Sequence, residues 1–376
     1  MAARYFFILL FITILSVYPN YVYPQTDNKE SLASSSCALA VNGIEGSTSD
    51  SAIIKNDKMP GKNKIQILPA NQFMLADKQR YTIDGEPPYI NTKIKPLEFT
   101  IFSTCMAGVF VAQHEAQQST IWKRTGPFNV SEDGKFSAYL DKGGHFFGTF
   151  MPSYVFSEIL MESGFSWDEA TLIGGSLGFA YTTYVEILDG LSLDWGFSPT
   201  DWFADVTGAS FFIAQHYIPF LQNFTPKFMY VKPSWHHEYD RREAMSFIDN
   251  YSCQTFYMGI NMHNILPESI NHYWPKWLDL SVGYAVYSLS SSFTEHNAEL
   301  ISDDSHFGKV YGNQKFLISL DYNLIELLPD GPGWWNWLRQ SLNYFKFPSP
   351  TLEIGKRSTK FFLLYPFYLQ IGNFRF

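Results

Sequence analysis

The most informative stretch of this chain is ATLIGGSLGFAYTTYVEILDG, residues 170–190. Steps of three or four residues along a helix return to the same face. Such steps connect one stripe of small and then acidic residues: Gly174, Gly178, Thr182, Glu186 and Asp189. Small residues let the backbones of two helices approach closely. The stripe therefore predicts a helix that packs through glycines near its start and carries carboxylates near its end.

Two other segments show comparable faces. The first is YLDKGGHFFGTF, residues 139–150, where one helical face carries Asp141, Gly144, His145 and Gly148. The second is residues 201–221, where one face carries Asp201, Asp205, Gly208, Phe212 and Gln215. We expect the three helices to pack through Gly144, Gly148, Gly174, Gly178 and Gly208, which would bring their acids together.

We call this expected cluster the polar seam, and its members are Asp141, Lys142, His145, Glu186, Asp189, Asp201 and Asp205. Packed carboxylates cannot all stay ionised without a cation. One hypothesis is therefore a divalent metal, with His145, Asp141, Glu186 and Asp205 as candidate ligands. A second is acid–base chemistry by His145, oriented by Asp141. We favour a third, a structural polar network, because Asp201, Asp141 and Asp189 also have ordinary roles near helix ends.

A block of four helices is predicted over residues 97–225. The apolar segments are 97–115, 144–161, 170–190 and 201–221. Each carries polar or charged residues within 20 positions, which favours a bundle over four membrane spans. Ser166 and Ser198 fit helix N-caps with an acid three residues later, and Pro199 fits the first helical position.

Residues 226–376 change to a period of two, which is typical of strands. Strand patterns with one apolar side occur in 254–262, 280–286 and 314–324, and the chain ends in the alternating YLQIGNFRF. The segment 334–345, WWNWLRQSLNYF, predicts an interrupting amphipathic helix. The fold class is therefore α+β, with a β-rich C-terminal half that forms an antiparallel sheet or a partial barrel. About five or six strands are predicted, whereas a single-chain barrel needs at least eight.

The N-terminal region and the composition point to export. Residues 1–25 resemble a signal peptide, with Arg4 before an apolar core, and residues 26–96 predict a polar linker and an irregular segment. The net charge of -9 without a basic stripe argues against nucleic acid as a partner. Aromatic residues make up 18% of the chain, which favours a membrane interface. We expect a location in the periplasm or outer membrane of a Gram-negative-type envelope, with membrane or envelope components as partners; an oligomer stays an open alternative.

Several segments together resemble a known family. They are DKGGHF (141–146), EILDGLSLDWGFSPTDWFADVTGA (186–209), EYDRREAM (238–245), DNYSCQTFYMGINMH (249–263) and YWPKWLDLSVGYAV (273–286). Over residues 97–290 the chain is similar to the YfiM-like domain of unknown function, a family of predicted periplasmic or outer-membrane-associated bacterial proteins, and more loosely to VanZ-like proteins. The positions that match the family's motif are Asp141, Lys142, His145, Glu186, Asp189, Gly190, Asp201 and Gly208. The sequence departs at 252–254, where the resemblance implies Asn-Gly-Gln or Asp-Gly-Gln.

The resemblance implies no reaction, so the expectation for function comes from the residues. We expect a non-enzymatic structural or scaffolding protein of the envelope, with the polar seam holding helices together. The first alternative is a metal-dependent enzyme that acts on a lipid or cell-wall substrate through Asp141, His145, Glu186, Asp189 and Asp205. The second alternative is a small outer-membrane barrel or channel. A divalent metal is the one cofactor that the residues suggest.

Overall fold

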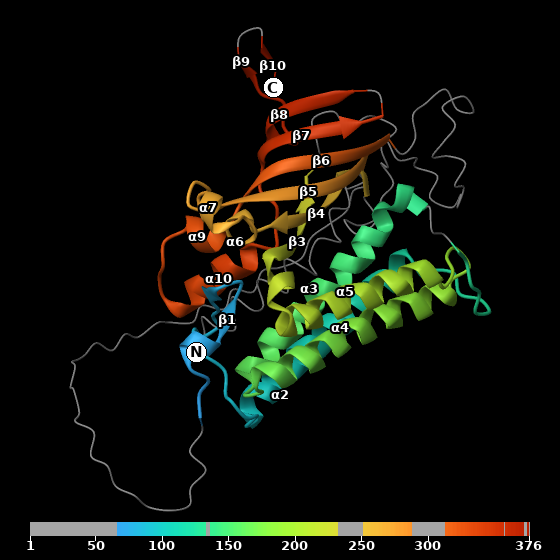
Figure 1. The fold of residues 1–376 in the computed structure, drawn as a ribbon. Coiled ribbons are helices and arrows are strands. Elements are labelled where there is room, and N and C mark those ends of the chain that lie inside the picture. The colour runs from blue at the N-terminus through green and yellow to red at the C-terminus, as the bar shows by residue number, and fades with distance from the viewer. Residues whose placement is uncertain are drawn as a thin grey trace, which may run out of the picture. The chain divides into compact units, whose positions relative to one another are not determined.

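The computed structural model describes residues 66–132, 136–231, 251–287, 313–356, 358–371 and 374–375, which all belong to one compact unit. A block of helices forms one layer, and a six-stranded antiparallel sheet lies beside it (Figure 1). The predicted α+β class is confirmed. The expected signal peptide, and the part of the expected linker before residue 66, lie outside the described residues.

The four predicted helices are present, with shifted ends. They are α2 (Pro96–Thr120), α3 (Leu140–Glu162), α4 (Trp167–Gly190) and α5 (Pro199–Tyr217). Helix α3 begins before the predicted residue 144, so the DKGGH motif is helical. Helix α5 ends before residue 221 and is followed by the 3-10 helix η3 (Pro219–Asn223). Both predicted N-caps are confirmed, because Ser166 and Ser198 each accept the backbone N–H of the acid three residues later at 3.3 Å.

Helix α3 lies against both α4 and α5, and glycines set the close approach. A Cβ atom at Gly174 would lie 2.7 Å from the backbone nitrogen of Ser157 on α3. A Cβ atom at Gly208 of α5 would lie 2.3 Å from the carbonyl oxygen of Phe146 on α3. Real Cβ atoms cannot approach backbone so closely, so both positions require glycine at these helix crossings.

Helix α2 lies at the outside of the block. Of its 25 residues, only Phe102 and Gln117 are buried, and Leu97 and Val111 are more than half exposed. Within the described residues, α2 is long and apolar enough to cross a membrane by length and composition alone, and only 6% of its most apolar window is buried.

The sheet is a meander in which each strand pairs with the next along the chain. Its strands are β3 (Phe224–Tyr230), β4 (Gln254–Ile260), β5 (Leu278–Tyr287), β6 (Asn313–Tyr322), β7 (Ser349–Gly355) and β8 (Thr359–Tyr365). The predicted aromatic helix is α10 (Gly333–Leu342). The remaining short elements are η1 (Ala70–Gln72), β1 (Met74–Leu75), β2 (Lys78–Gln79), η2 (Phe136–Tyr139), η4 (Tyr251–Cys253), α6 (Met262–Ile265), α7 (Glu268–Asn271), α9 (Leu324–Leu327), β9 (Gln370–Ile371) and β10 (Phe374–Arg375).

The largest apolar core joins α3 to α5, to α10 and to strands β3 and β4. Phe147 of α3 stacks on Phe228 of β3 with ring centroids 5.5 Å apart, and Tyr154 packs against Tyr344. The N-terminal segment 66–95 was expected to be irregular, and it contains only short elements. It nevertheless contributes to this core, because the buried Arg80 side chain forms an ion pair with Glu158 of α3.

Candidate functional site

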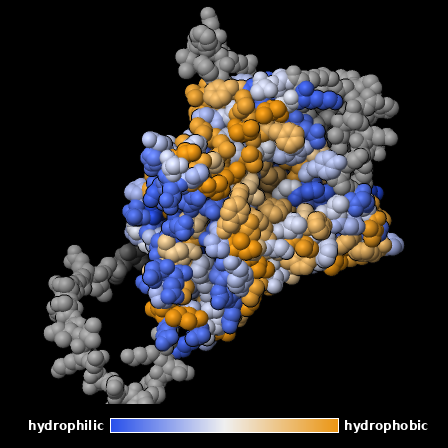
Figure 2. Space-filling model, viewed as in Figure 1, coloured by the Kyte–Doolittle hydropathy of each residue, from blue (hydrophilic) through white to orange (hydrophobic). Residues whose placement is uncertain are grey.

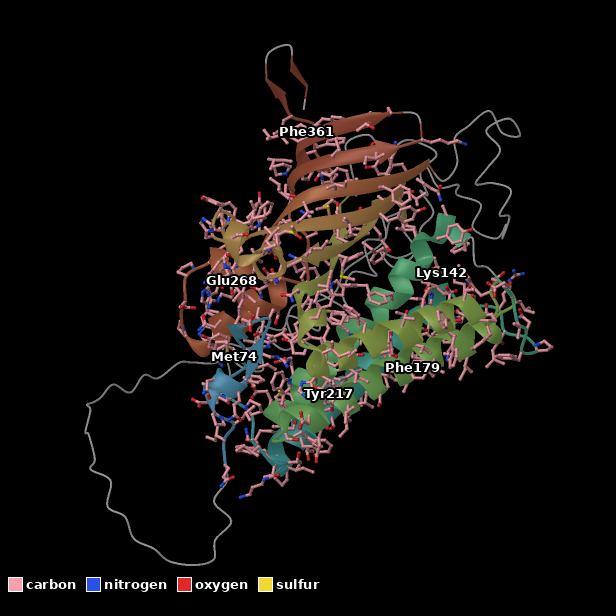
Figure 3. The ribbon with its side chains drawn as sticks, viewed as in Figure 1. Met74, Lys142, Phe179, Tyr217, Glu268 and Phe361 are labelled. Atoms are coloured by element: carbon pink, nitrogen blue, oxygen red, sulfur yellow. The ribbon has the colours of Figure 1, made fainter. Side chains whose placement is uncertain are left out.

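The polar seam forms at one end of the helical block. Asp141, Lys142 and His145 lie in the first two turns of α3, Asp201 and Asp205 lie in the first two turns of α5, and Glu186 lies in the last turns of α4. Figure 3 shows Lys142 near this end of the block and Tyr217, the last residue of α5, toward the other end. The N-termini of α3 and α5 favour nearby carboxylates, since the helix dipole is positive there. Three helix ends therefore bring the charges together.

His145 lies at the centre of the cluster. Its Nδ1 atom is 3.2 Å from Asp205 Oδ1 and 3.5 Å from Glu186 Oε1. Its Nε2 atom is 3.7 Å from Asp141 Oδ1 and 3.8 Å from Asp201 Oδ1. Each ring nitrogen thus faces two carboxylates, and the four carboxylates come from all three helices.

Lys142 supplies a cation to one half of the cluster. Its ammonium group lies 3.0 Å from Asp141 Oδ2 and donates a hydrogen bond to Asp201 Oδ1. The hydroxyl of Tyr251, which precedes β4, donates to Asp141 Oδ1. This half has a cation of its own and a hydrogen-bond donor from the C-terminal half of the chain.

The other half holds Glu186 and Asp205, whose side chains are 2% and 0% exposed. Glu186 Oε2 accepts the backbone N–H of Ser198 at 3.1 Å, and Asp205 Oδ1 accepts the hydroxyl of Thr149 at 2.9 Å. Asp205 Oδ2 is buried, and within the described part of the chain it has no hydrogen-bond partner. In that part His145 is the ion-pair partner of both carboxylates.

The charges shift the pKa values in opposite directions. Burial alone would raise the pKa of Asp141, but the adjacent Lys142 and then His145 lower it to about 2. Burial opposes protonation of His145, yet Asp201, Asp141 and Asp205 together raise its pKa well above the usual value. Burial raises the pKa of Glu186 to about 8, although His145 acts against this rise. The surrounding carboxylates therefore favour the protonated form of His145, and burial favours the neutral form of Glu186.

A cavity of about 680 Å³ adjoins the cluster. His145 and Thr182 line it, together with mostly apolar side chains of α3, α4, β3 and β4. Gly144 and Gly148 also line it, which differs from the expectation that they pack against another helix. A Cβ atom at Gly148 would meet nothing within 4 Å, and one at Gly144 would meet only aromatic rings of Phe256 and Tyr251 at 3.7 Å. The reason is that α3 turns this face toward the sheet rather than toward α4 or α5.

The structure places Asp189 apart from the centre of the cluster. Its Oδ1 atom accepts a hydrogen bond from the Trp122 indole at 2.6 Å, beside the end of α4. Conversely, the sequence analysis missed Thr149 and Tyr251. Thr149 lies four residues after His145, so helical spacing could have placed it on the same face. Tyr251 follows Asp141 by 110 residues, and no local signal connects the two.

Two sets of side chains present potential metal-ligand atoms within 4.8 Å of one another: Asp141, His145 and Asp201, and His145, Glu186 and Asp205. The same geometry also serves a structural network that joins three helices. The fold and this cluster together define an α+β protein whose helical block holds a partly buried histidine among buried carboxylates.

Residues 131–216 match the family model described as "Predicted periplasmic lipoprotein (DUF2279)". The match covers less than half of the chain, includes every residue of the polar seam and supports an uncharacterised, exported bacterial periplasmic domain. No curated protein and no solved structure matches the chain.

Proposed function

We propose that this chain is an exported envelope protein that lies against the outer membrane through one face of its sheet and has a structural or scaffolding role there. The observation that carries the proposal is an inverted sheet. Strand β6 alternates Lys315, Leu317, Ser319 and Asp321 on a buried face with Phe316, Ile318, Leu320 and Tyr322 on the opposite face. In water, burying charges while exposing apolar side chains is doubly unfavourable. Lipid against the outer face removes the cost of exposing apolar side chains to water.

The inversion continues across neighbouring strands. The register places Val282 of β5 beside Ile318 of β6, Ile318 beside Leu352 of β7, and Leu352 beside Phe361 of β8. These four side chains are 37–52% exposed. Figure 2 shows apolar residues gathered over the sheet in the upper part of the view. Contiguous exposed apolar surface of this kind marks a membrane or partner interface rather than scattered surface residues.

The dimensions and the aromatic residues favour lipid as the occupant. From Phe316 to Tyr322, strand β6 carries an apolar face about 20 Å long. Tyr284 and Phe316 lie opposite each other at one end. At the other end, Trp277 is 40% exposed and directly precedes β5. Apolar bands of about 25 Å between aromatic belts are typical of strands that face a bilayer.

The alternatives have less support. Six of the described strands, β3 to β8, form one open sheet, and a single-chain barrel needs at least eight. An enzymatic role would need a substrate pose at His145, and the hydrogen bonds of Asp141, Asp201 and Glu186 serve equally well to join helices. The same proposal includes three finer points. They are a likeness to YfiM-like and VanZ-like proteins, the outer membrane as the location, and membrane components as partners.

The test is fractionation of the envelope from cells that export the full-length chain, followed by a urea wash. We expect the wild type to stay in the outer-membrane fraction. Ile318→Lys puts a charge in the middle of the apolar face, at a cost of about 2–4 kcal/mol in lipid, and we expect urea to release it. Ser269→Lys adds the same charge on the exposed helix α7 and should behave as the wild type. Release of the folded wild type by urea, or retention of Ile318→Lys, would contradict the proposal.

A further inference from the structure

We propose that His145, Glu186 and Asp205 bind one Zn²⁺ ion that links α3, α4 and α5. The inference is independent of the membrane proposal, since it depends only on the interior of the helical block. Each of the three helices contributes one ligand. Imidazole nitrogens and carboxylate oxygens both bind Zn²⁺, and three protein ligands are enough for a site that keeps its fourth position open.

The first support is that this half of the polar seam lacks a cation of its own. Lys142 lies between Asp141 and Asp201, so one of the two negative charges of that pair is already compensated. Glu186 and Asp205 share only the ring of His145 among the ion pairs of the described residues. Two buried carboxylates facing one imidazole nitrogen leave at least one oxygen without a proton donor.

The second support is an orphaned ligand atom. The Asp205 side chain is fully buried, and its Oδ2 atom has no hydrogen-bond partner in the described part of the chain. A buried carboxylate oxygen without a partner carries the full cost of its lost hydration. A metal ion that contacts this Oδ2 atom as well as Oδ1 would remove that cost, whereas a purely structural network leaves it in place.

The third support is the spacing of the ligand atoms. Zinc bonds to nitrogen and oxygen are about 2.0–2.2 Å long, so two ligand atoms of a tetrahedral site lie roughly 3.3–3.5 Å apart. His145 Nδ1 lies 3.2 Å from Asp205 Oδ1 and 3.5 Å from Glu186 Oε1. These two separations fit two edges of a tetrahedron around one ion, and the three ligand atoms of the set all lie within 4.8 Å of one another.

The surroundings supply what such a site needs beyond three ligands. Asp141 and Asp201 lie 3.7 Å and 3.8 Å from His145 Nε2, on the side away from the proposed ion. Carboxylates in this place orient a metal-binding imidazole. His145 and Thr182 also line the 680 Å³ cavity, so the proposed site adjoins a space large enough to hold water.

The experiment titrates Zn²⁺ into full-length protein that was purified in detergent and stripped with a chelator. We expect one Zn²⁺ per chain by elemental analysis and a rise in Tm with Zn²⁺ concentration. Glu186→Gln and Asp205→Asn should each weaken binding by roughly 100-fold or more, because loss even of an outer-shell partner costs 10–100-fold. Asp168→Asn is the matched control, since it changes a carboxylate in the first turn of the same helix, at the end away from the polar seam, that is 74% exposed and pairs with His216. It should bind Zn²⁺ as the wild type does.

A second measurement keeps the proposal testable if a variant fails to fold. Co²⁺ loaded into the wild type should give visible ligand-field absorption that one equivalent of Zn²⁺ abolishes. Absence of both stoichiometric Zn²⁺ and this absorption would overturn the proposal. Unchanged Zn²⁺ binding in folded Glu186→Gln and Asp205→Asn would also overturn it. Loss of binding in Asp201→Asn alone would overturn it too, because that result would assign the ion to the Asp141 side.

Discussion

Lys227 and Asp321 form an ion pair inside the sheet, with Nζ 3.2 Å from Oδ2 and both side chains 1% exposed. Lys346 Nζ lies 3.6 Å from the other oxygen of the same carboxylate. Only three residues before Asp321, Ile318 points from the opposite face and is 42% exposed. The charged side of the strand is therefore the interior of this half of the protein, which is the reverse of an ordinary water-soluble sheet.

Loss of the Asp321 carboxylate should destabilise the protein strongly. Asp321→Asn leaves two buried lysines without their shared partner, and breaking a buried pair in this way costs about 3–5 kcal/mol. Denaturant unfolding of the full-length protein in detergent measures the change. Asp194→Asn is a suitable control, because that carboxylate pairs at the surface with Arg124, whose side chain is 65% exposed, so about 0–1 kcal/mol is expected. Equal effects of the two variants would argue against a charged interior.

The stability should rise with pH on the alkaline side because of Lys346. Burial lowers the pKa of this lysine from 10.5 to about 8, and Asp321 only partly opposes the shift. Between pH 8 and 10.5 the unfolded chain therefore binds more protons than the folded one, so the free energy of unfolding increases with pH. The increase from this group is at most roughly 1.4 kcal/mol per pH unit.

The measurement compares wild type with Lys346→Met between pH 8 and 9.5, below the range in which exposed tyrosines ionise. The wild type should gain stability relative to the variant as the pH rises. A constant difference between the two proteins over this range would show that Lys346 keeps an ordinary pKa in the folded state.

Two glycines of the helical block should respond in opposite directions to alanine. At Gly178 a Cβ atom would lie 2.9 Å from the backbone nitrogen of Ser153 and 3.0 Å from the carbonyl oxygen of Thr149. We expect Gly178→Ala to lower the free energy of unfolding by about 1–3 kcal/mol through overpacking. Gly148→Ala meets open space and should raise it by up to about 1 kcal/mol through helix propensity. Thermal unfolding of both variants is sufficient, and destabilisation by Gly148→Ala would place that glycine at a helix contact after all.

The N-terminal segment should contribute substantially to stability through Arg80. This side chain pairs with Glu158, whose other oxygen accepts the indole N–H of Trp337 at 3.1 Å. Arg80→Met leaves a buried carboxylate uncompensated, so a loss of about 3–5 kcal/mol is expected. The double variant Arg80→Met/Glu158→Leu should recover at least half of the loss, because two apolar groups replace both charges. A double variant as unstable as the single one would indicate that Arg80 acts through packing alone.

Local sequence patterns were sufficient for the elements and for part of the site. Helix caps at Ser166 and Ser198 and the stripe of Gly174, Gly178 and Glu186 depend on contacts within a few residues, so spacing alone predicts them. Period-two alternation likewise located β4, β5 and β6. These features are determined by the sequence because backbone geometry fixes which neighbours share a face.

The tertiary structure decided which partner each face meets. Sequence spacing put Gly148 and His145 on one face of α3, but only the position of the sheet shows that Gly148 lines a cavity while Thr149 reaches Asp205. Tyr251 joins Asp141 across 110 residues, and no local rule describes such a contact. The alternation in β6 separates two faces but does not show which of them is buried. Only packing shows that Asp321 is inside and Ile318 outside. Burial is a property of the assembled elements, which is why the inversion of the sheet and the orphaned oxygen of Asp205 emerge only in three dimensions.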